Sequence, residues 1–599
     1  MSDDTAASPG LAPAIRDVLE RHWLALTLIA WAVMAVWFVA NGWNAVRWLS
    51  LSDTDDNMRL MQVRALLNGQ DWYDLRQYRM NPPAGFDIHW TRIVDLPIAG
   101  LILLLKPFVG TFWAERLACG IAPLLPMSVT LAALAFTVRR LVNPLAWPLA
   151  VVFLLLCTTT LLMFMPERID HHGWQLASLA MTVAGLADPA RRRGGAVVGL
   201  ASAFSLSIGL EMLPYAAGAG AIIGLRWVWD RAEAPRMTVY GGCLAIGCTL
   251  GYLGFASYAN SVLRCDALTP VWLSVMVAAG GLLVLLGTLN PASPPARFGL
   301  AVVAGALIIA GFAGVFPQCL GRPEQVSPEL QRNWLDNIRE AKPVYTHPFR
   351  VYFPVVMLPV IGLVGAITAT WRARGEPTFA AWAGVLLFTL LAGGLLLWQS
   401  RASAAAQLLG VPGTIALTWI VLPWFLQSRS MLVRVFGTVG GFLIVSGAFA
   451  GFVVKWLPVE QPTARTKTID RASGSCPSYT ALKPLDHLPP QTIFTFIDLG
   501  PRLITVTHHS AIAGPYHRNG GAILDVQHAF GGSPDRFRAI AKAHGARLLL
   551  ICPNMAESTV YRSRNKGGFY DRLADGQVPA WLTPIAMPKK SPLKLWRIE

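Results

Sequence analysis

Residues 23–56 read WLALTLIAWAVMAVWFVANGWNAVRWLSLSDTDD, an apolar run followed directly by an acidic cluster. Residues 23–46 contain no charged side chain. About 20 apolar residues are enough for a helix to cross the hydrocarbon core of a membrane. We therefore predict a transmembrane helix over 23–46, with the acidic cluster just outside the membrane.

The composition extends this interpretation to most of the chain. Of 599 residues, 54% are hydrophobic and only 14% are charged, whereas soluble domains average about 25% charged residues. This excludes an ordinary soluble enzyme and an intrinsically disordered chain. The net charge of +16 does not indicate nucleic acid as a partner, because most basic residues lie in short loops between apolar runs. Such loops are typical of the cytoplasmic side of membrane proteins.

The apolar runs predict a polytopic α-helical membrane protein with about 13 transmembrane helices. The predicted spans are residues 23–46, 116–138, 144–165, 174–188, 194–212, 213–229, 237–259, 270–289, 297–316, 351–371, 378–398, 403–426 and 433–455.

A further apolar stretch, 96–113, is predicted to lie along the outer membrane interface. If it crossed the membrane, the later arginine-rich loops would all move to the outer side, against the usual charge rule. With this assignment the N-terminus is cytoplasmic. Three long segments are then outside: residues 47–115, 317–350 and everything after 456.

The sequence divides into a transmembrane part, 1–456, and a tail, 457–599, predicted to be a small α/β domain outside the membrane. We expect strands at Thr492–Asp498, Leu503–Thr507 and Arg547–Cys552. A helix is expected after Ser533, because Pro534 suits the first helical position.

The cysteines divide between the two environments. Four lie in predicted spans, and four lie on the outer side, where disulfides are permitted. Cys476 and Cys552 flank the predicted strands and either form a disulfide or pack as buried thiols; we favour the disulfide. Cys265 and Cys319 lie on separate loops and are a less favoured pair.

The first candidate site is the acidic cluster, with Asp53, Asp55 and Asp56, followed by Arg59. Neighbouring carboxylates repel one another unless a cation intervenes. Hard cations such as Mg²⁺ and Mn²⁺ prefer carboxylate oxygens. The alternative is a solvated acidic loop.

The second cluster, P-E-R-I-D-H-H-G-W at 166–174, falls on the same predicted face. On an extended segment Asp170 and His172 would point the same way and share one metal ion, with His171 directed elsewhere. The alternative is an interfacial turn anchored by Trp174.

Three further charged residues stand out on this face. Glu340 precedes Pro343 by three residues, so we expect extended backbone there. Glu211 lies in an apolar stretch, where an ionisable group is costly and functional by default. Arg401 follows the eleventh span and either clamps a lipid phosphate or snorkels to the headgroups.

Together these motifs resemble the catalytic subunit of oligosaccharyltransferase, in the GT-C superfamily of polyprenyl-linked sugar transferases. D-T-D-D-N-M-R occupies the place of that family's first-loop Asp motif, which selects Asp53. D-H-H at 170–172 is similar to its second motif, whose Asp and second His bind metal. I-R-E-A-K-P resembles its loop motif and selects Glu340. Arg401 falls where the family contacts the donor phosphate, and Arg59 is a second candidate for that role.

The resemblance covers roughly 1–456 and stops there. The family's acceptor-reading W-W-D is absent, since the tryptophans of the tail are Trp456, Trp581 and Trp596. The candidates for acceptor recognition are instead Glu211, His508, His509, Tyr516, His517 and Arg518.

The resemblance implies transfer of a sugar or oligosaccharide, with inversion, from a polyprenyl phosphate or pyrophosphate to a glycan, lipid or protein. It implies Mg²⁺ or Mn²⁺ held by Asp53, Asp170 and His172. The expected location is a bacterial inner membrane, with the tail in the periplasm. The alternatives are a lipid-linked glycan flippase, a true protein N-oligosaccharyltransferase and a non-catalytic scaffold.

Overall fold

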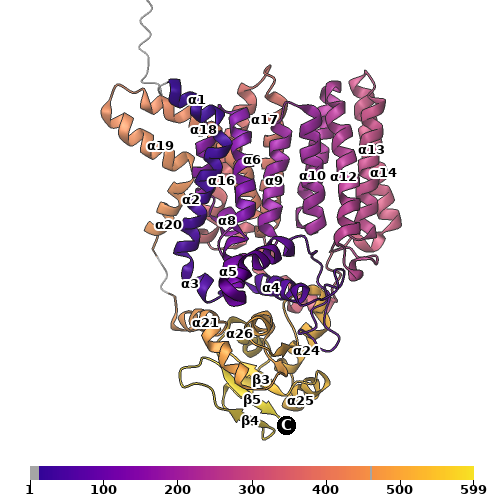
Figure 1. Cartoon of the computed structure of the whole chain (residues 1–599), viewed down its shortest axis with the longest axis vertical. Coiled ribbons are helices and arrows are strands. Elements are labelled where there is room, and N and C mark those ends of the chain that lie inside the picture. The colour runs from indigo at the N-terminus through magenta and orange to yellow at the C-terminus, as the bar shows by residue number, and fades with distance from the viewer. Residues whose placement is uncertain (1–12, 459–461) are drawn as a thin grey trace, which may run out of the picture.

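The structure is a computed structural model that describes residues 13–458 and 462–599. Upright helices lie side by side in a bundle, and the C-terminal domain lies beneath one end of it (Figure 1). The helices of the bundle are α1 (Pro13–Arg21), α2 (Trp23–Asn41), α6 (Leu124–Leu141), α7 (Trp147–Leu156), α8 (Thr158–Leu162), α9 (His172–Ala187), α10 (Arg191–Ile208), α11 (Leu213–Trp229), α12 (Ala234–Phe255), α13 (Pro270–Leu289), α14 (Pro294–Val315), α16 (Phe349–Arg372), α17 (Phe379–Trp398), α18 (Ser403–Leu426), α19 (Thr438–Val445) and α20 (Ala448–Trp456).

The protein is a polytopic helical membrane protein. Within the described ranges, eight helical segments are long and apolar enough to cross a membrane, and the bent pair at the end of the bundle makes a ninth. The other predicted spans coincide with α7–α8, α9, α10 and α11, which are shorter or less apolar. The total of thirteen spans therefore stays a prediction.

The last predicted span, 433–455, is not one straight helix. A π-helical turn, Val433–Gly437, leads into α19, and the chain then bends by 91° before α20. Gly447, at the bend, has φ 75°, a left-handed conformation that glycine adopts without steric cost. The apolar composition did not reveal this bend.

The stretch predicted to lie along the interface is part of a longer helix, α5 (Asp95–Ile121). It lies with α4 (Thr54–Leu67) under the lower ends of the upright helices, next to the C-terminal domain (Figure 1). The helix is kinked at Gly110, where φ is 73°. Apolar side chains such as Phe108, which is 81% exposed, cover its outer surface. The next upright helix, α6, begins at Leu124, so residues 116–121 of the predicted second span belong to α5.

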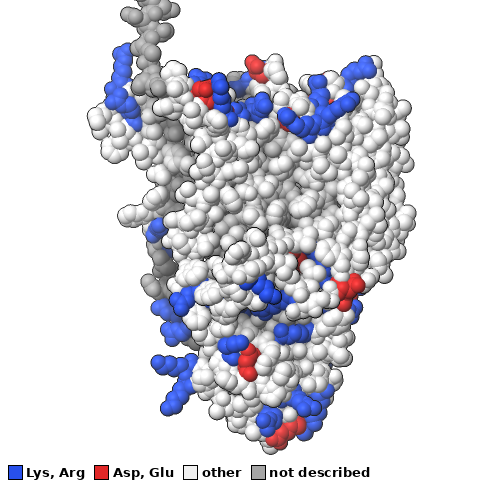
Figure 2. Space-filling view, viewed as in Figure 1, with Lys and Arg blue, Asp and Glu red and all other residues white. Residues whose placement is uncertain are grey.

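Basic residues gather at the end of the bundle opposite the C-terminal domain (Figure 2). We name this the arginine-rich end, and the opposite end the domain end. The arginines near the helix ends and turns that we assign to this end are Arg139, Arg140, Arg191, Arg192, Arg193, Arg226, Arg231, Arg236, Arg297, Arg372 and Arg374.

The C-terminal domain contains a five-stranded sheet of order β2-β1-β3-β5-β4. β1 pairs in parallel with β2 and β3, whereas β5 pairs antiparallel with β3 and β4. The strands are β1 (Thr492–Phe494), β2 (Ser510–Ala511), β3 (Leu548–Ile551), β4 (Leu582–Ile585) and β5 (Lys594–Ile598), and the helices are α21 (Ala464–Ser475), α22 (Tyr479–Leu482), α23 (Gly500–Val506), α24 (Gly520–Gly531), α25 (Pro534–Ala543), α26 (Ala556–Arg564) and α27 (Phe569–Ala574).

Two of the three predicted strands are confirmed in part, and one is wrong. β1 and β3 form within the predicted ranges, and α25 begins where the Ser533 cap predicts it. Leu503–Thr507 is not a strand but lies mostly in α23. Pro501 starts that helix, and its residues are buried against α4, so packing overrides their β-branched side chains.

The first outer loop shares a hydrophobic core with the C-terminal domain. Met80, Phe86 and Trp90 are at most 4% exposed and belong to the same buried cluster as Phe494 and Leu549 of the sheet. The contact between bundle and domain is therefore an apolar core, and not only a polar surface.

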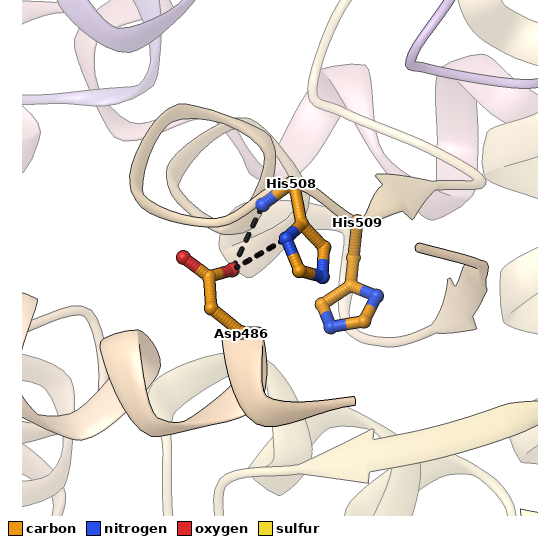
Figure 3. A group of neighbouring side chains, drawn as sticks. All are labelled: Asp486, His508 and His509. Carbon is orange, nitrogen blue, oxygen red and sulfur yellow. Dashed lines mark hydrogen bonds and ion pairs between the residues drawn. The ribbon is translucent and has the colours of Figure 1, made fainter. Parts of the chain in front are cut away.

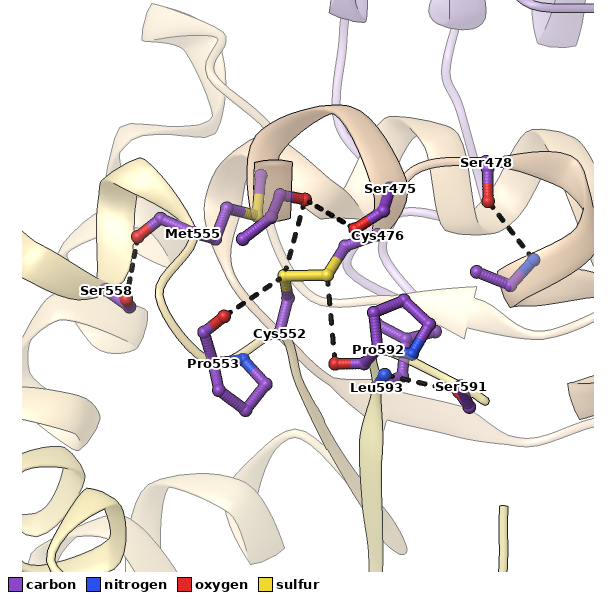
Figure 4. Close-up of a disulfide and its surroundings, with 12 residues drawn as sticks. Ser475, Cys476, Ser478, Cys552, Pro553, Met555, Ser558, Ser591, Pro592 and Leu593 are labelled. Carbon is purple, nitrogen blue, oxygen red and sulfur yellow. Dashed lines mark hydrogen bonds between the residues drawn. A yellow bond between two sulfur atoms is a disulfide. The ribbon is translucent and has the colours of Figure 1, made fainter. Parts of the chain in front are cut away.

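Two disulfides crosslink segments at the domain end. Cys476 and Cys552 are bonded, with Cα atoms 6.0 Å apart, which confirms that prediction (Figure 4). Cys265 and Cys319 are bonded as well, so our preference against that pair was wrong. Their loops are distant in sequence, and only the fold brings them together. The four cysteines in the predicted spans are free thiols.

Candidate active site

The acidic cluster forms the beginning of α4. Asp53 is the N-cap, and its carboxylate accepts hydrogen bonds from the amides of Asp55 (2.9 Å) and Asp56 (3.2 Å). Asp56 accepts in return from the amide of Asp53 (3.0 Å). This reciprocal capping box explains why these residue types start a helix here. It also places the carboxylates at the positive end of the helix dipole.

The second cluster meets the first in space. The amide of Asp170 donates to the Asp56 carboxylate at 2.9 Å. Among the described residues, Asp53, Asp56 and Asp170 each place a carboxylate oxygen within 4.8 Å of the other two, as a metal ion would require. The structure thus brings together the two motifs that the sequence suggested.

Arg168 lies between these carboxylates and was not among the residues predicted from the sequence. Its guanidinium bonds to Asp53, lies 3.4 Å from Asp56 and 2.8 Å from Asp170. Its place two residues before Asp170, within the same motif, was the signal that could have identified it. The group is a cation already bound by the three carboxylates.

His172 contacts the cluster from the start of α9. Its Nδ1 lies 3.1 Å from Oδ2 of Asp170. The predicted extended backbone is wrong, because Asp170 accepts from the amide of His172 (3.0 Å) and turns the chain into the helix. His171 points elsewhere, as expected, and its Nε2 donates to Glu211 (3.1 Å).

Glu211 lies behind the cluster and supports it. Besides His171, its carboxylate accepts from Gln175 (2.8 Å) and lies 3.8 Å from His89. Glu211 follows Gly209 in a short 3-10 turn, Leu210–Met212, between α10 and α11. The residue therefore fixes His171 and, through the backbone, its neighbours Asp170 and His172.

The carboxylates of the cluster differ in their pKa values. Burial, reinforced by the charge of Asp170, raises the pKa of Asp55 to about 7. The same two causes raise the pKa of Asp56. Burial also acts to raise the pKa of Asp170, but His172 and Arg168 outweigh it and lower that pKa below its usual range. The site therefore combines an ionised carboxylate with one that titrates near neutral pH.

Glu340 and Arg401 are paired with each other. The Arg401 guanidinium lies 3.5 Å from the Glu340 carboxylate, and their side chains are 38% and 66% exposed. Ser400 donates its amide to the carbonyl of Lys342 (2.7 Å), which docks the loop on the end of α17. The expected extended backbone is wrong here too, since Glu340 lies in a 3-10 turn, Arg339–Ala341.

Arg59 lies inside the protein. Its side chain is fully buried and forms an ion pair with Asp95 (2.8 Å), and its guanidinium lies over the ring of Trp90. Its contacts are with the first outer loop and α5, so the residue holds α4 in place and does not face a ligand.

Three of the five candidates in the tail hold the domain on the bundle. Tyr516 donates its hydroxyl to the carbonyl of Thr54 (2.7 Å), directly beside the acidic cluster. Arg518 makes a bidentate pair with Asp266 (2.7 Å for both bonds), and His517 also contacts Asp266 (2.6 Å). These residues position the domain around the site.

His508 and His509 are bonded within the domain. With Asp486 they form a second group whose ligand atoms converge within the described ranges (Figure 3). Each imidazole Nε2, however, bonds to a backbone carbonyl, of Leu488 (2.7 Å) or Leu485 (2.9 Å). Lys483 also pairs with Asp486 (2.7 Å), so this group is held by protein contacts and fixes the turn before β1.

The donor set of the first cluster fits a divalent metal. Oδ2 of Asp170 and Nδ1 of His172 converge, are buried and make no hydrogen bond of good geometry. Carboxylate oxygens together with an imidazole nitrogen are ligands that Mg²⁺, Mn²⁺ and Zn²⁺ accept. Asp53, Asp56, Asp170 and His172 could therefore hold one ion if Arg168 moved aside.

The fold of this chain is shared by solved membrane proteins of low sequence identity. Comparison with solved structures finds the archaeal oligosaccharyltransferase AglB from Archaeoglobus fulgidus, in complex with an inhibitory peptide and a dolichol-phosphate. It has 14% identity and a TM-score of 0.64 over 94% of this chain and 73% of that one. The apo form of the Archaeoglobus fulgidus oligosaccharyltransferase has 14% identity and a TM-score of 0.62 over 94% of this chain and 73% of that one.

A third structure, the Archaeoglobus fulgidus oligosaccharyltransferase in complex with Zn and sulfate, has 12% identity and a TM-score of 0.59 over 94% of this chain and 72% of that one. No family model matches the chain. No curated protein matches its sequence. The likeness thus establishes the fold that the sequence motifs predicted.

Proposed function

We propose that this protein is an inverting membrane glycosyltransferase that moves a sugar or oligosaccharide from a polyprenyl-(pyro)phosphate donor to an acceptor. The observation that carries the proposal is the meeting of Asp53, Asp56, Asp170 and His172 at the domain end. These residues come from two motifs that are separated by about a hundred positions in sequence. The GT-C fold supports the same conclusion.

The proposed cofactor is Mg²⁺ or Mn²⁺, held by Asp53, Asp170 and His172, with Asp56 beside them. When bound, such an ion acts as a Lewis acid that neutralises the departing phosphate. Arg401 would contact the same phosphate once Glu340 releases it, because a guanidinium binds phosphate as well as carboxylate. Glu340, once released from this pair, would be a further carboxylate that could hold the ion.

Asp55 is the proposed base for the acceptor. Asp53 and Asp56 are already engaged in the helix cap and with Arg168, whereas Asp55 makes no such pair in the described structure. A carboxylate with a pKa near 7 is well matched to accept a proton from an acceptor hydroxyl at neutral pH. The proton would move to an Asp55 oxygen as the acceptor oxygen attacks the sugar.

We propose that the arginine-rich end faces the cytoplasm of a bacterial inner membrane and that the C-terminal domain is periplasmic. The gathering of arginines at one end of the bundle supports this orientation. Cysteines introduced at Arg192 and Gly520 test it. The first should react only with a reagent applied from the cytoplasm and the second only with one applied from the periplasm, and the reverse would overturn it.

The acceptor is a glycan, a lipid or a protein. The Archaeoglobus fulgidus oligosaccharyltransferase, which shares this fold, has been solved with a tethered acceptor peptide that contains the NVT sequon, but the W-W-D motif is absent from this chain. Protein N-glycosylation is therefore the second candidate and not the first. A lipid-linked glycan flippase is the alternative from another class.

One experiment separates these possibilities. The purified protein is incubated in detergent with polyprenyl-linked oligosaccharide and Mn²⁺, and release of the glycan is followed by mass spectrometry. A transferase consumes the donor in micelles, whereas a flippase needs a sealed bilayer. Absence of turnover in micelles, together with donor translocation in liposomes, would overturn the proposal. A sequon peptide added as acceptor tests N-glycosylation.

A further inference from the structure

A cleft of about 500 Å³ opens between the loop that follows α4 and the loop that joins α12 to α13. Its volume lies within the range of about 300–1,000 Å³ found for small-molecule sites. None of the residues that line it belongs to the carboxylate cluster or to the Glu340–Arg401 pair. The cleft is therefore a second feature at the domain end that needs an explanation.

Three tyrosines dominate one part of the cleft: Tyr73, Tyr78 and Tyr258. Tyr78 is 49% exposed and Tyr258 is 61% exposed, so large aromatic surfaces face water. Their hydroxyls are fixed by carboxylates, since Tyr78 donates to Asp74 (3.0 Å) and Tyr258 donates to Asp71 (3.2 Å). The hydroxyls are held in place while much of each of these two side chains stays exposed.

The polar part of the cleft is nearly balanced in charge. Arg76 pairs with Asp87 (3.0 Å), and Arg264 lies 3.9 Å from the same carboxylate. The three aspartates that line the cleft face two arginines. Such a surface offers fixed hydrogen-bond donors and acceptors together, but has no excess positive charge for a polyphosphate. Among the described residues, its carboxylates also do not converge as metal ligands.

Open aromatic faces beside paired acidic and basic groups match the chemistry of a sugar. The C–H face of a pyranose ring stacks on an aromatic ring, and its hydroxyls both donate and accept hydrogen bonds. We propose that this cleft binds a neutral saccharide, with Tyr78 and Tyr258 stacking on sugar faces and Asp87 and Arg264 bonding to hydroxyls. No component of the proposal requires a metal or a covalent step.

The walls of the cleft are preorganised. Arg92, which is buried, donates to the carbonyls of Asp71 (3.0 Å), Trp72 (2.7 Å) and Asp74 (2.6 Å). The amide of Tyr258 donates to the carbonyl of Tyr73 (2.9 Å), which joins the two loops. The second loop is also fixed by the Cys265–Cys319 disulfide. A rigid site loses less entropy when a ligand binds.

The same buried groups connect the cleft to the candidate active site. Arg92 lies 3.6 Å from Asp95, which pairs with Arg59 of α4 (2.8 Å). The helix that begins with the acidic cluster and the floor of the cleft thus rest on one ion-pair network. Use of the cleft as the subsite for a glycan acceptor rests on the proposed function, whereas saccharide binding itself does not.

The test is saturation-transfer NMR on the full-length protein in lipid nanodiscs. The probes are four neutral trisaccharides (mannotriose, maltotriose, galactotriose and arabinotriose) and one peptide, Ala-Asn-Ala-Thr-Ala. We expect at least one trisaccharide to bind. The double variant Tyr78→Ala/Tyr258→Ala should bind it about tenfold more weakly, because two stacking faces are lost. The matched variant Tyr78→Phe/Tyr258→Phe keeps both rings and should stay within about threefold of the wild type.

Three results would overturn the proposal: no trisaccharide binds the wild type, the alanine variant binds as well as the wild type, or only the peptide binds and loses affinity in the alanine variant. Thermal melting of each variant confirms that it is folded. Donor hydrolysis by the wild type in detergent is measured in parallel. If the trisaccharide binds but the wild type never consumes donor, the proposed function is wrong, whereas the proposal of saccharide binding in the cleft is supported. If donor is consumed but no saccharide binds, the proposal of saccharide binding in the cleft is wrong and the proposed function is kept.

Discussion

The amide of Asp170 donates a 2.9 Å hydrogen bond to the carboxylate of Asp56, joining two acidic motifs that lie 114 residues apart. Asp56 at the same time caps α4 by accepting from the amide of Asp53. One carboxylate therefore sets both the start of a helix and the position of the second motif. Substitutions in this cluster affect stability and chemistry together unless the variant is chosen to separate them.

Asp53→Asn separates the two effects. Asparagine caps helices nearly as well as aspartate, but it removes a negative ligand from the site. We expect donor turnover to fall by about 100-fold or more, with little change in the melting temperature. Asp53→Ala should lose activity and also about 1 kcal/mol of stability. Asp535→Asn, at an exposed position, is the control, and wild-type turnover by Asp53→Asn would contradict the site.

Metal removal is the second prediction. After exhaustive chelation, donor turnover should fall to background and return on addition of Mn²⁺ or Mg²⁺, because the departing phosphate then has a Lewis acid again. Turnover is followed by mass spectrometry of the released glycan. Full activity in the chelated protein would mean that Asp170 and His172 are not ligands.

Arg168→Gln tests whether this arginine takes the place of a cation. Its loss leaves buried carboxylates without a partner, which costs roughly 3–5 kcal/mol in comparable ion pairs. In metal-free buffer the variant should therefore melt earlier than the wild type. Added Mn²⁺ should raise its melting temperature more than that of the wild type, since the freed carboxylates bind the ion and a ligand stabilises the folded state. Equal shifts in both proteins would exclude competition between Arg168 and the metal.

The pKa of Asp55, raised to about 7 mainly by burial, predicts the pH dependence. Below this value Asp55 is protonated in the folded protein and accepts no proton from the acceptor. The transfer rate should therefore fall about tenfold for each pH unit below 7 and level off above it. Asp55→Asn should be slow at every pH, without this slope. A wild-type rate that stays constant down to about pH 5.5 would remove Asp55 from the role of base.

The Cys476–Cys552 disulfide predicts a stability difference. Both cysteines are fully buried, and the bond closes a loop of 76 residues. Cys476→Ser should lower the free energy of unfolding by roughly 3–5 kcal/mol on the chain-entropy account. Thermal melting measures the loss, and Cys243→Ser, at a half-buried free thiol, should change little. An unchanged melting temperature in Cys476→Ser would show that the bond contributes no net stability.

The sequence predicted the membrane fold, the C-terminal domain and the meeting of the two acidic motifs, because apolar runs and unusual carboxylates are visible residue by residue. It did not predict Arg168 between the carboxylates or the pairing of Cys265 with Cys319. Both depend on loops that only the folded bundle brings together. Leu503–Thr507 was misassigned for a related reason: its β-type residues pack against α4, and this contact is not encoded locally.

Met80, Phe86 and Trp90 complete the core of a domain whose own chain begins almost four hundred residues later. An isolated 457–599 fragment would therefore expose an apolar surface and aggregate, and a bundle truncated before it would do the same. Exchange of this domain between proteins of the same fold cannot proceed by recombination at the linker alone, since a transplanted domain needs a matching first loop. Any evolutionary change in this shared core must therefore occur jointly in two distant regions of the gene.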